Sequence, residues 1–237
     1  MKMVKRVLLL ILSTDILTGM CGCIGFNRQS YSDVMVEYLN EKYDDDEFEY
    51  LSPFGGGAGA SYKQIICSSE KYPDEEVSVL FDIDEDGNKI IKDNYLAIKY
   101  KEQVIELLDK ILTECFETDH LLFYDVNMYS FTDNSTQDTT FEEFISTASS
   151  YITFTAVINS EYEVDRDYVE RIVQKKFVEN GFCCRIGVIY FDGGTGSYDG
   201  LESTELSGYG YRKDYKECFD FDMETNEYFS KSKWREK

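Results

Sequence analysis

The chain has very little histidine. Its 237 residues include one histidine, His120. A metal site with two histidines is therefore excluded, and a Ser-His-Asp or Cys-His arrangement would have to use this residue. The chain has no C-x-x-C pair, which excludes a zinc ribbon or a thioredoxin-type motif. It also has no G-x-S-x-G, and the S-x-x-K at residues 68–71 has no K-T-G to accompany it.

Basic residues are scarce as well. The chain has 24 lysines and arginines against 46 acidic residues, a net charge of −22. Without residues 1–22, which hold three basic residues and one acidic residue, the net charge becomes −24. Such a surface repels phosphate backbones, so we expect no nucleic-acid partner and regard cations or basic partners as the natural counterparts. Because 43% of the residues are hydrophobic and 15% aromatic, we expect a folded chain.

Long apolar runs are absent too. The run from Val7 to Leu12 is far shorter than the roughly 20 apolar residues that a membrane-spanning helix needs. Lys2, Lys5 and Arg6 precede that run, and small residues are frequent at 18–22, just before a cysteine. This order of basic, apolar and small residues is typical of a secretory signal peptide. The sequence therefore predicts that residues 1–22 are a signal segment.

The end of this segment, Met20-Cys21-Gly22-Cys23, resembles the lipobox of bacterial lipoproteins. The resemblance implies cleavage before Cys23 and attachment of a lipid to that cysteine. Cys21 is the alternative, although Met20 then stands where a small residue is preferred. The protein would lie at the extracytoplasmic face of the cell membrane and contact the membrane only through its lipid anchor.

We expect residues 23–31 to form a tether and 32–228 a single α+β domain, with a mixed, mainly antiparallel sheet packed by three to four helices. The domain is either one body or two lobes that meet near 130–140, and the basic tail 229–237 is expected to be frayed. Helical spacing of apolar residues predicts helices at 32–43, 95–116, 141–147 and 165–178. Strand patterns and turn residues predict extended structure from 48 that breaks at Pro53, and strands at 62–67, 77–83, 89–92, 121–129, 151–158, 182–191 and 215–221.

Three segments carry a further resemblance: VEYLNEKYDDDEFEYLSPFGG (36–56), DNYLAIKYKEQVIELL (93–108) and TTFEEFI (139–145). They are similar to parts of secreted or lipid-anchored proteins of clostridial-type Gram-positive bacteria. The resemblance implies a cellular compartment and no activity, and it brings no catalytic residues with it.

Asp82, Asp84 and Asp86, followed by Gly87, match the D-x-D-x-D-G opening of a calcium loop. An EF-hand would place a bidentate Glu at the twelfth position, where this chain has Asp93. The alternative is a hairpin turn whose carboxylates are solvated. Ca²⁺ is therefore the one cofactor that the sequence suggests.

Four tyrosines, Tyr198, Tyr209, Tyr211 and Tyr215, gather near the glycine-rich segment 193–200. Exposed aromatic side chains can stack on sugar rings or anchor a protein interface. The alternative is that these tyrosines pack on the domain as ordinary strand residues.

We interpret the chain as a cell-surface binding module whose partner is a protein or an envelope polymer. One alternative is a hydrolase that cleaves envelope or glycan substrates with two of its many carboxylates. A second alternative is a calcium-dependent structural module. The five remaining cysteines are expected to be mostly buried as small apolar residues, with one or two disulfides as the other option: Cys67, Cys115, Cys183, Cys184 and Cys218.

Overall fold

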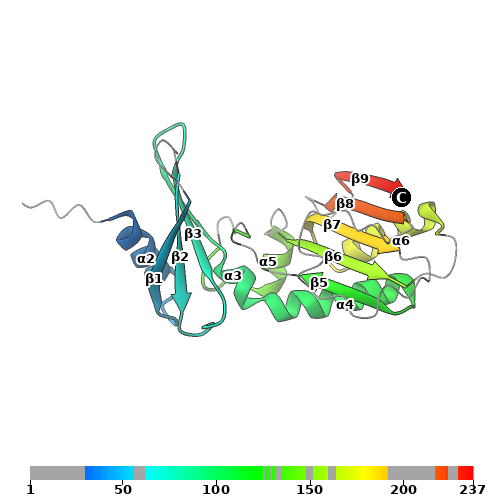
Figure 1. The fold of residues 1–237 in the computed structure, drawn as a ribbon, viewed down its shortest axis with the longest axis horizontal. Coiled ribbons are helices and arrows are strands. Elements are labelled where there is room, and N and C mark those ends of the chain that lie inside the picture. The colour runs from blue at the N-terminus through cyan, green and yellow to red at the C-terminus, as the bar shows by residue number, and fades with distance from the viewer. Residues whose placement is uncertain are drawn as a thin grey trace, which may run out of the picture.

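The computed structural model describes the greater part of the chain from Ser30 onward and shows the α+β class that the sequence predicts. Within that part, five helices accompany two mainly antiparallel sheets (Figure 1). The described residues are 30–55, 62–124, 126, 128, 130–131, 135–147, 152–159, 164–191, 217–223 and 229–236.

The first lobe is a four-stranded antiparallel sheet with one helix packed on it. The strands follow the order β1-β2-β3-β4, so that each strand pairs with its neighbours in sequence. The elements are α2 (Tyr31–Lys42), β1 (Phe48–Gly55), β2 (Lys63–Ser69), β3 (Val77–Ile83) and β4 (Lys89–Asp93).

Helix α2 begins one residue earlier than the sequence predicts, because Ser30 is its N-cap. The Ser30 hydroxyl accepts a hydrogen bond from the Asp33 amide, and the Asp33 carboxylate accepts one from the Ser30 amide. This capping box satisfies two amides that would otherwise have no partner within the helix. Met35 and Leu39 lie one helical turn apart and are completely buried in the core shared with β2 and β3.

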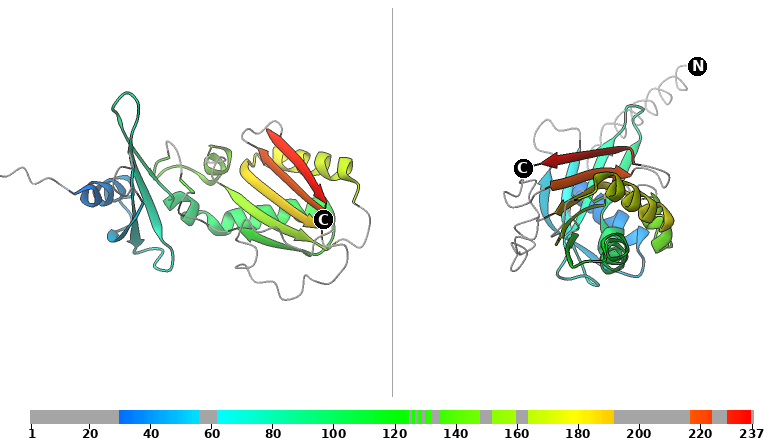
Figure 2. Two further views of the ribbon diagram at one scale, coloured as in Figure 1. Left: turned by 45° about the horizontal axis from the view of Figure 1, so that its top comes forward. Right: turned by 90° about the vertical axis from the view of Figure 1, so that its right-hand side faces the viewer.

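The second lobe is a five-stranded sheet in the order β5-β6-β7-β8-β9. Strands β6 and β7 are parallel and are joined through α6, whereas the other pairs are antiparallel. Helices α4 and α6 pack against the same face of this sheet (Figure 2). The elements are α4 (Lys101–Phe116), β5 (His120–Tyr124), α5 (Phe141–Thr147), β6 (Thr153–Ile158), α6 (Arg166–Glu179), β7 (Cys184–Phe191), β8 (Glu217–Met223) and β9 (Lys231–Glu236).

The expected helix at 95–116 is divided in two. Helix α3 (Tyr95–Lys99) ends at Lys99, α4 begins at Lys101, and Tyr100 is the cap residue between them. The Tyr100 hydroxyl donates to the Thr139 carbonyl at 2.6 Å, and its ring packs on Phe141 and Phe144. Tyr100 therefore joins this junction to the segment just before α5.

The two lobes share one apolar core, which runs from Met35 in α2 to Met223 in β8. Segment 135–140 links to the first lobe through Gln137. Its side-chain oxygen accepts from the Asp44 amide at 3.0 Å, and its carbonyl accepts from Lys99 Nζ at 3.3 Å. The chain therefore folds as two sheets connected by a continuous core and by this segment.

The prediction of a frayed tail is wrong for residues 231–236, which form β9. Trp234 stacks on Phe219 of β8 with ring centroids 4.8 Å apart. The pairing register sets Lys233 opposite Asp220 and Lys231 opposite Asp222. Because the basic tail lies along an acidic strand, opposite charges and aromatic packing hold it in the sheet.

The five cysteines predicted to be mostly buried apolar residues are all buried, and no disulfide joins any two of them. Burial raises the pKa of the Cys67 and Cys115 thiols to about 12. Burial likewise raises the pKa of Cys184 and Cys218. Thiols with a raised pKa are poor nucleophiles, which fits a packing role.

Candidate functional site

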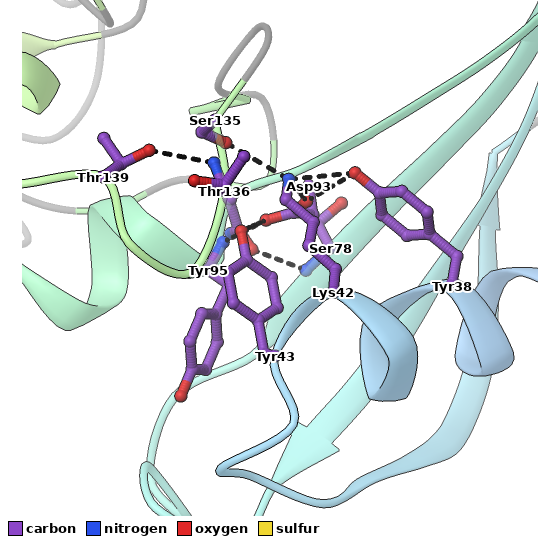
Figure 3. A network of polar contacts seen from close by, with 10 residues as sticks. Tyr38, Lys42, Tyr43, Ser78, Asp93, Tyr95, Ser135, Thr136 and Thr139 are labelled. Carbon is purple, nitrogen blue, oxygen red and sulfur yellow. Dashed lines mark hydrogen bonds and ion pairs between the residues drawn. The ribbon is translucent and has the colours of Figure 1, made fainter.

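The most extensive polar network in the first lobe surrounds Asp93, the last residue of β4. The Asp93 side chain is fully buried. Its Oδ1 accepts hydrogen bonds from the Tyr43 hydroxyl at 2.9 Å and the Tyr95 amide at 3.1 Å. Its Oδ2 accepts from Lys42 Nζ at 2.7 Å and the Tyr38 hydroxyl at 3.2 Å. Figure 3 shows these donors arriving from α2 and from the start of α3.

Lys42, in the last turn of α2, is the cation of this network. Its side chain is 12% exposed. Besides Asp93, its Nζ donates to the Tyr38 hydroxyl at 2.9 Å and to Ser135 Oγ at 3.2 Å. The Lys42 ammonium also lies 5.0 Å from the centroid of the Tyr43 ring, within the range of a cation–π contact. The buried charge pair is therefore surrounded by compensating groups.

Tyr38 and Tyr43 act as fixed hydrogen-bond donors to Asp93. Burial, followed by the negative charge of Asp93, raises the pKa of both phenols. Both hydroxyls therefore keep their protons at physiological pH and can donate to the carboxylate.

Lys42 and Ser135 together have the composition of a serine–lysine catalytic dyad. That chemistry needs a lysine with a free lone pair to take the proton of the serine hydroxyl. In the ion pair with Asp93, Lys42 is an ammonium, which has three donors and no lone pair. We therefore interpret the network as a structural connection between α2, β4 and segment 135–140.

A second buried carboxylate, Asp46, holds the turn between α2 and β1. Its Oδ2 accepts from the Ser69 hydroxyl at 2.5 Å, and its Oδ1 accepts from the amides of Glu47 and Lys71. Burial alone would raise the pKa of Asp46, but the hydrogen bonds from Ser69, from Tyr95 and from these amides hold it below its ordinary value. This carboxylate is therefore occupied by internal donors.

The three aspartates of the predicted calcium loop lie around the β3–β4 hairpin turn. Asp84 Oδ1 accepts from the amides of Asp86 and Asn88, at 3.0 and 2.7 Å, and Gly87 takes a φ of 83°. Hydrogen bonding, chiefly from the Asn88 side chain, lowers the pKa of Asp84. Among the described residues, no group of three or more His, Cys, Asp or Glu side chains is placed to hold a metal ion. Calcium binding by Asp82, Asp84 and Asp86 stays a prediction.

The other predicted site residues lie outside the described residues. These are the lipidation candidates, Cys23 and Cys21, and the four tyrosines of the predicted binding surface, Tyr198, Tyr209, Tyr211 and Tyr215. His120 is described: its Nε2 lies 3.0 Å from Asp109 Oδ1, and this contact ties the start of β5 to α4.

The extended structure predicted from residue 48 is β1, but the predicted break at Pro53 is wrong, because the strand continues through Pro53 to Gly55, and the sequence did not predict how exposed its side chains are. After Phe48, every residue of this strand up to Phe54 is exposed. The exposed fractions are 46% for Tyr50, 55% for Leu51 and 42% for Phe54. The first lobe also exposes other large apolar side chains. Among the described residues of the second lobe, one large apolar side chain is exposed, in α6. These are Tyr31, Tyr62 and Ile83 in the first lobe and Tyr168 in the second.

Two β-bulges interrupt β1 at two of these side chains. In its pairing with β2, the register shifts between Tyr50 and Ser52 and again between Pro53 and Gly55. The extra residues are Leu51 and Phe54, so each bulge carries an apolar residue. Bulges re-aim side chains and are common at sheet edges and next to functional sites. The signal in the sequence is Tyr50-Leu51 and Pro53-Phe54, where alternation between polar and apolar residues fails.

Within the described residues, none of the helices combines the length and the apolar composition that a membrane span requires. No protein-family model matches the chain, and no curated protein matches it. Among solved structures, the chain is similar to the crystal structure of a DUF5037 family protein from Ruminococcus gnavus ATCC 29149. That match has 12% sequence identity and a TM-score of 0.35, and it covers 85% of this chain and 95% of the other. A likeness at this TM-score carries no argument about fold or function.

Proposed function

We propose that the protein is a lipid-anchored binding module at the extracytoplasmic face of the cell membrane, where it contacts another protein or an envelope polymer. The order of basic, apolar and small residues before Cys23 supports export and anchoring. The observation that carries the binding role is β1, an edge strand whose two bulge residues, Leu51 and Phe54, are apolar and exposed. A contiguous exposed apolar patch marks an interaction site, and three exposed apolar side chains of β1, Tyr50, Leu51 and Phe54, lie within five residues of one strand.

The two buried carboxylates of the first lobe do not fit the hydrolase alternative. A glycoside hydrolase needs two carboxyls that reach one substrate bond from a shared cleft. Asp93 and Asp46 are both buried, and their oxygens accept hydrogen bonds from internal donors. They hold the first lobe together, so the proposed binding role rests on the exposed side chains of β1.

The anchoring part of the proposal is tested by cell fractionation of the full chain after expression in a Gram-positive host. We expect the wild type in the membrane fraction and the Cys23→Ser variant in the medium or the soluble fraction. The matched control is Cys21→Ser, which should stay in the membrane. If Cys21→Ser is released and Cys23→Ser is retained, the lipid is on Cys21. If the wild type and both variants are all absent from the membrane fraction, the anchoring proposal is contradicted.

The binding part is tested by sedimentation of the full chain, carrying Cys21→Ser and Cys23→Ser, with isolated cell envelopes. Leu51→Ser should reduce the sedimented fraction several-fold. Tyr168→Ser replaces an exposed apolar residue of α6 and should leave the sedimented fraction unchanged. Pretreating the envelopes with protease or with a wall-degrading enzyme tells a protein partner from a polymer. Equal sedimentation of all variants would contradict a role for β1.

A further inference from the structure

The surroundings of β1 narrow the chemistry of its partner. Residues 30–100, which contain the first lobe, have 17 acidic and six basic side chains. Exposed acids lie directly at the start of β1: Glu47 and Glu49 are exposed, and so is Glu70, whose amide donates to the Glu47 carbonyl at 3.1 Å. An apolar strand therefore begins beside a group of solvent-exposed carboxylates.

The edge position of β1 sets the shape of the partner. In the described part of the chain, β1 pairs only with β2, so its outer edge faces away from the sheet. Two bulges and Pro53, which has no backbone N–H, interrupt this edge, so a continuous ladder with a partner strand would be short. Side-chain contacts must then supply most of the affinity, chiefly through Tyr50, Leu51 and Phe54.

We infer that β1 docks an extended segment of another protein that carries both basic and apolar side chains. Its apolar side chains would cover Leu51 and Phe54, and its basic side chains would face Glu47, Glu49 and Glu70. An arginine or lysine can also lie over an exposed Tyr or Phe ring in a cation–π contact. This inference rests on the proposed binding function and names the partner class for the same surface.

Charge complementarity favours this partner over a bilayer. An anionic membrane would be repelled by the carboxylates at the start of β1, whereas a cationic segment is attracted by them. A partner that is only cationic would leave Leu51 and Phe54 in water, and one that is only apolar would leave the carboxylates without a counterpart.

The test uses three labelled hexapeptides as probes, RWRWRW, RGRGRG and EWEWEW. Fluorescence anisotropy measures their binding to the full chain carrying Cys21→Ser and Cys23→Ser. We expect RWRWRW to bind at least tenfold more tightly than either other probe and to weaken as salt increases. The L51S/F54S variant should weaken RWRWRW binding by about tenfold or more, as truncation of interface anchors does.

Three controls keep the outcomes separate. Tyr168→Ser should bind RWRWRW like the wild type, and E47Q/E49Q should lose affinity mainly at low salt. Thermal unfolding should show that L51S/F54S is folded, as expected for exposed positions. Equal binding of RGRGRG and RWRWRW, or no effect of L51S/F54S, would overturn the inference.

The last experiment measures binding of the protein to phosphatidylglycerol vesicles. Binding to vesicles that depends on Leu51 and Phe54, without binding to RWRWRW, would overturn the inference in favour of a membrane contact. If no probe binds but Leu51→Ser still lowers envelope sedimentation, the partner class is wrong and the binding function stands. If sedimentation is also unaffected, the binding function itself fails.

Discussion

The two sheets of this protein end in different ways. The five-stranded sheet ends at β9, where Lys231 and Lys233 lie opposite Asp222 and Asp220 and Trp234 packs inward. The four-stranded sheet ends at β1, where two bulges present Leu51 and Phe54 to solvent. One edge is completed by charge pairing and aromatic packing, whereas the other presents an apolar surface beside carboxylates. Within the described residues, β9 therefore stabilises its lobe, whereas β1 is the edge that our proposal assigns to a partner.

The largest loss of unfolding free energy should come from Asp93→Ala, which removes the hydrogen-bond acceptor at the centre of the first lobe. Lys42 and the hydroxyls of Tyr38 and Tyr43 would then lose their shared partner. Breaking a buried ion pair by removing one partner costs about 3 kcal/mol of unfolding free energy. Urea unfolding measures the loss. The Lys42→Met/Asp93→Leu variant removes both charges and should lose less, and a larger loss there would contradict a role for uncompensated charge.

A smaller effect, in the second lobe, should follow Gly187→Ala. A Cβ at position 187 would lie 2.4 Å from Cζ of Phe221 on the neighbouring strand. Overpacking of this kind costs about 2 kcal/mol, and thermal unfolding would detect it. Adding Phe221→Leu makes room for the methyl group, so the double variant should lose less than the sum of the two single changes. Strict additivity would show that the close approach is not the cause.

Asp46→Asn tests the turn that leads into β1, and its effect should depend on pH. Because the pKa of Asp46 is lowered in the folded state, its ionised form stabilises the fold at any pH above the ordinary aspartate value. This contribution is lost as the pH falls through the lowered pKa. At pH 7 the variant should lose about 1 kcal/mol in urea unfolding, and the difference from the wild type should shrink below about pH 4. A difference that grows on acidification would contradict the assignment.

The smallest effect is expected from Asp84→Ala in the β3–β4 turn. The Asp84 carboxylate accepts from the Asp86 and Asn88 amides, so its removal should lower the Tm slightly. We expect the same shift with and without millimolar calcium. A calcium-dependent rise in Tm of the wild type, absent in Asp84→Ala, would instead support the calcium loop of the sequence prediction.

Local patterns in the sequence predicted most elements near their observed bounds. Helical spacing predicts α6 near its observed bounds, and in the structure the Asp165 side chain caps that helix by accepting a hydrogen bond from the Tyr168 amide. Alternation of apolar and polar residues over 77–83, followed by the Asp86-Gly87 turn, predicts the β3–β4 hairpin. The helix predicted at 95–116 is instead divided at Tyr100, whose contacts reach residues 139–144 far along the chain. Such a contact leaves no mark in the spacing of residues 95–116.

The sequence by itself determined the α+β class, the acidic character, the burial of the five cysteines and most element positions. These depend on short windows of residues, on composition and on intrinsic side-chain preferences. Only the tertiary structure decided that Lys42 meets Asp93, 51 positions away, that the basic tail becomes β9, and that Leu51 and Phe54 are the bulge residues of an edge strand. These features depend on which distant strands and helices pack together, and residue spacing along the chain carries no information about that choice.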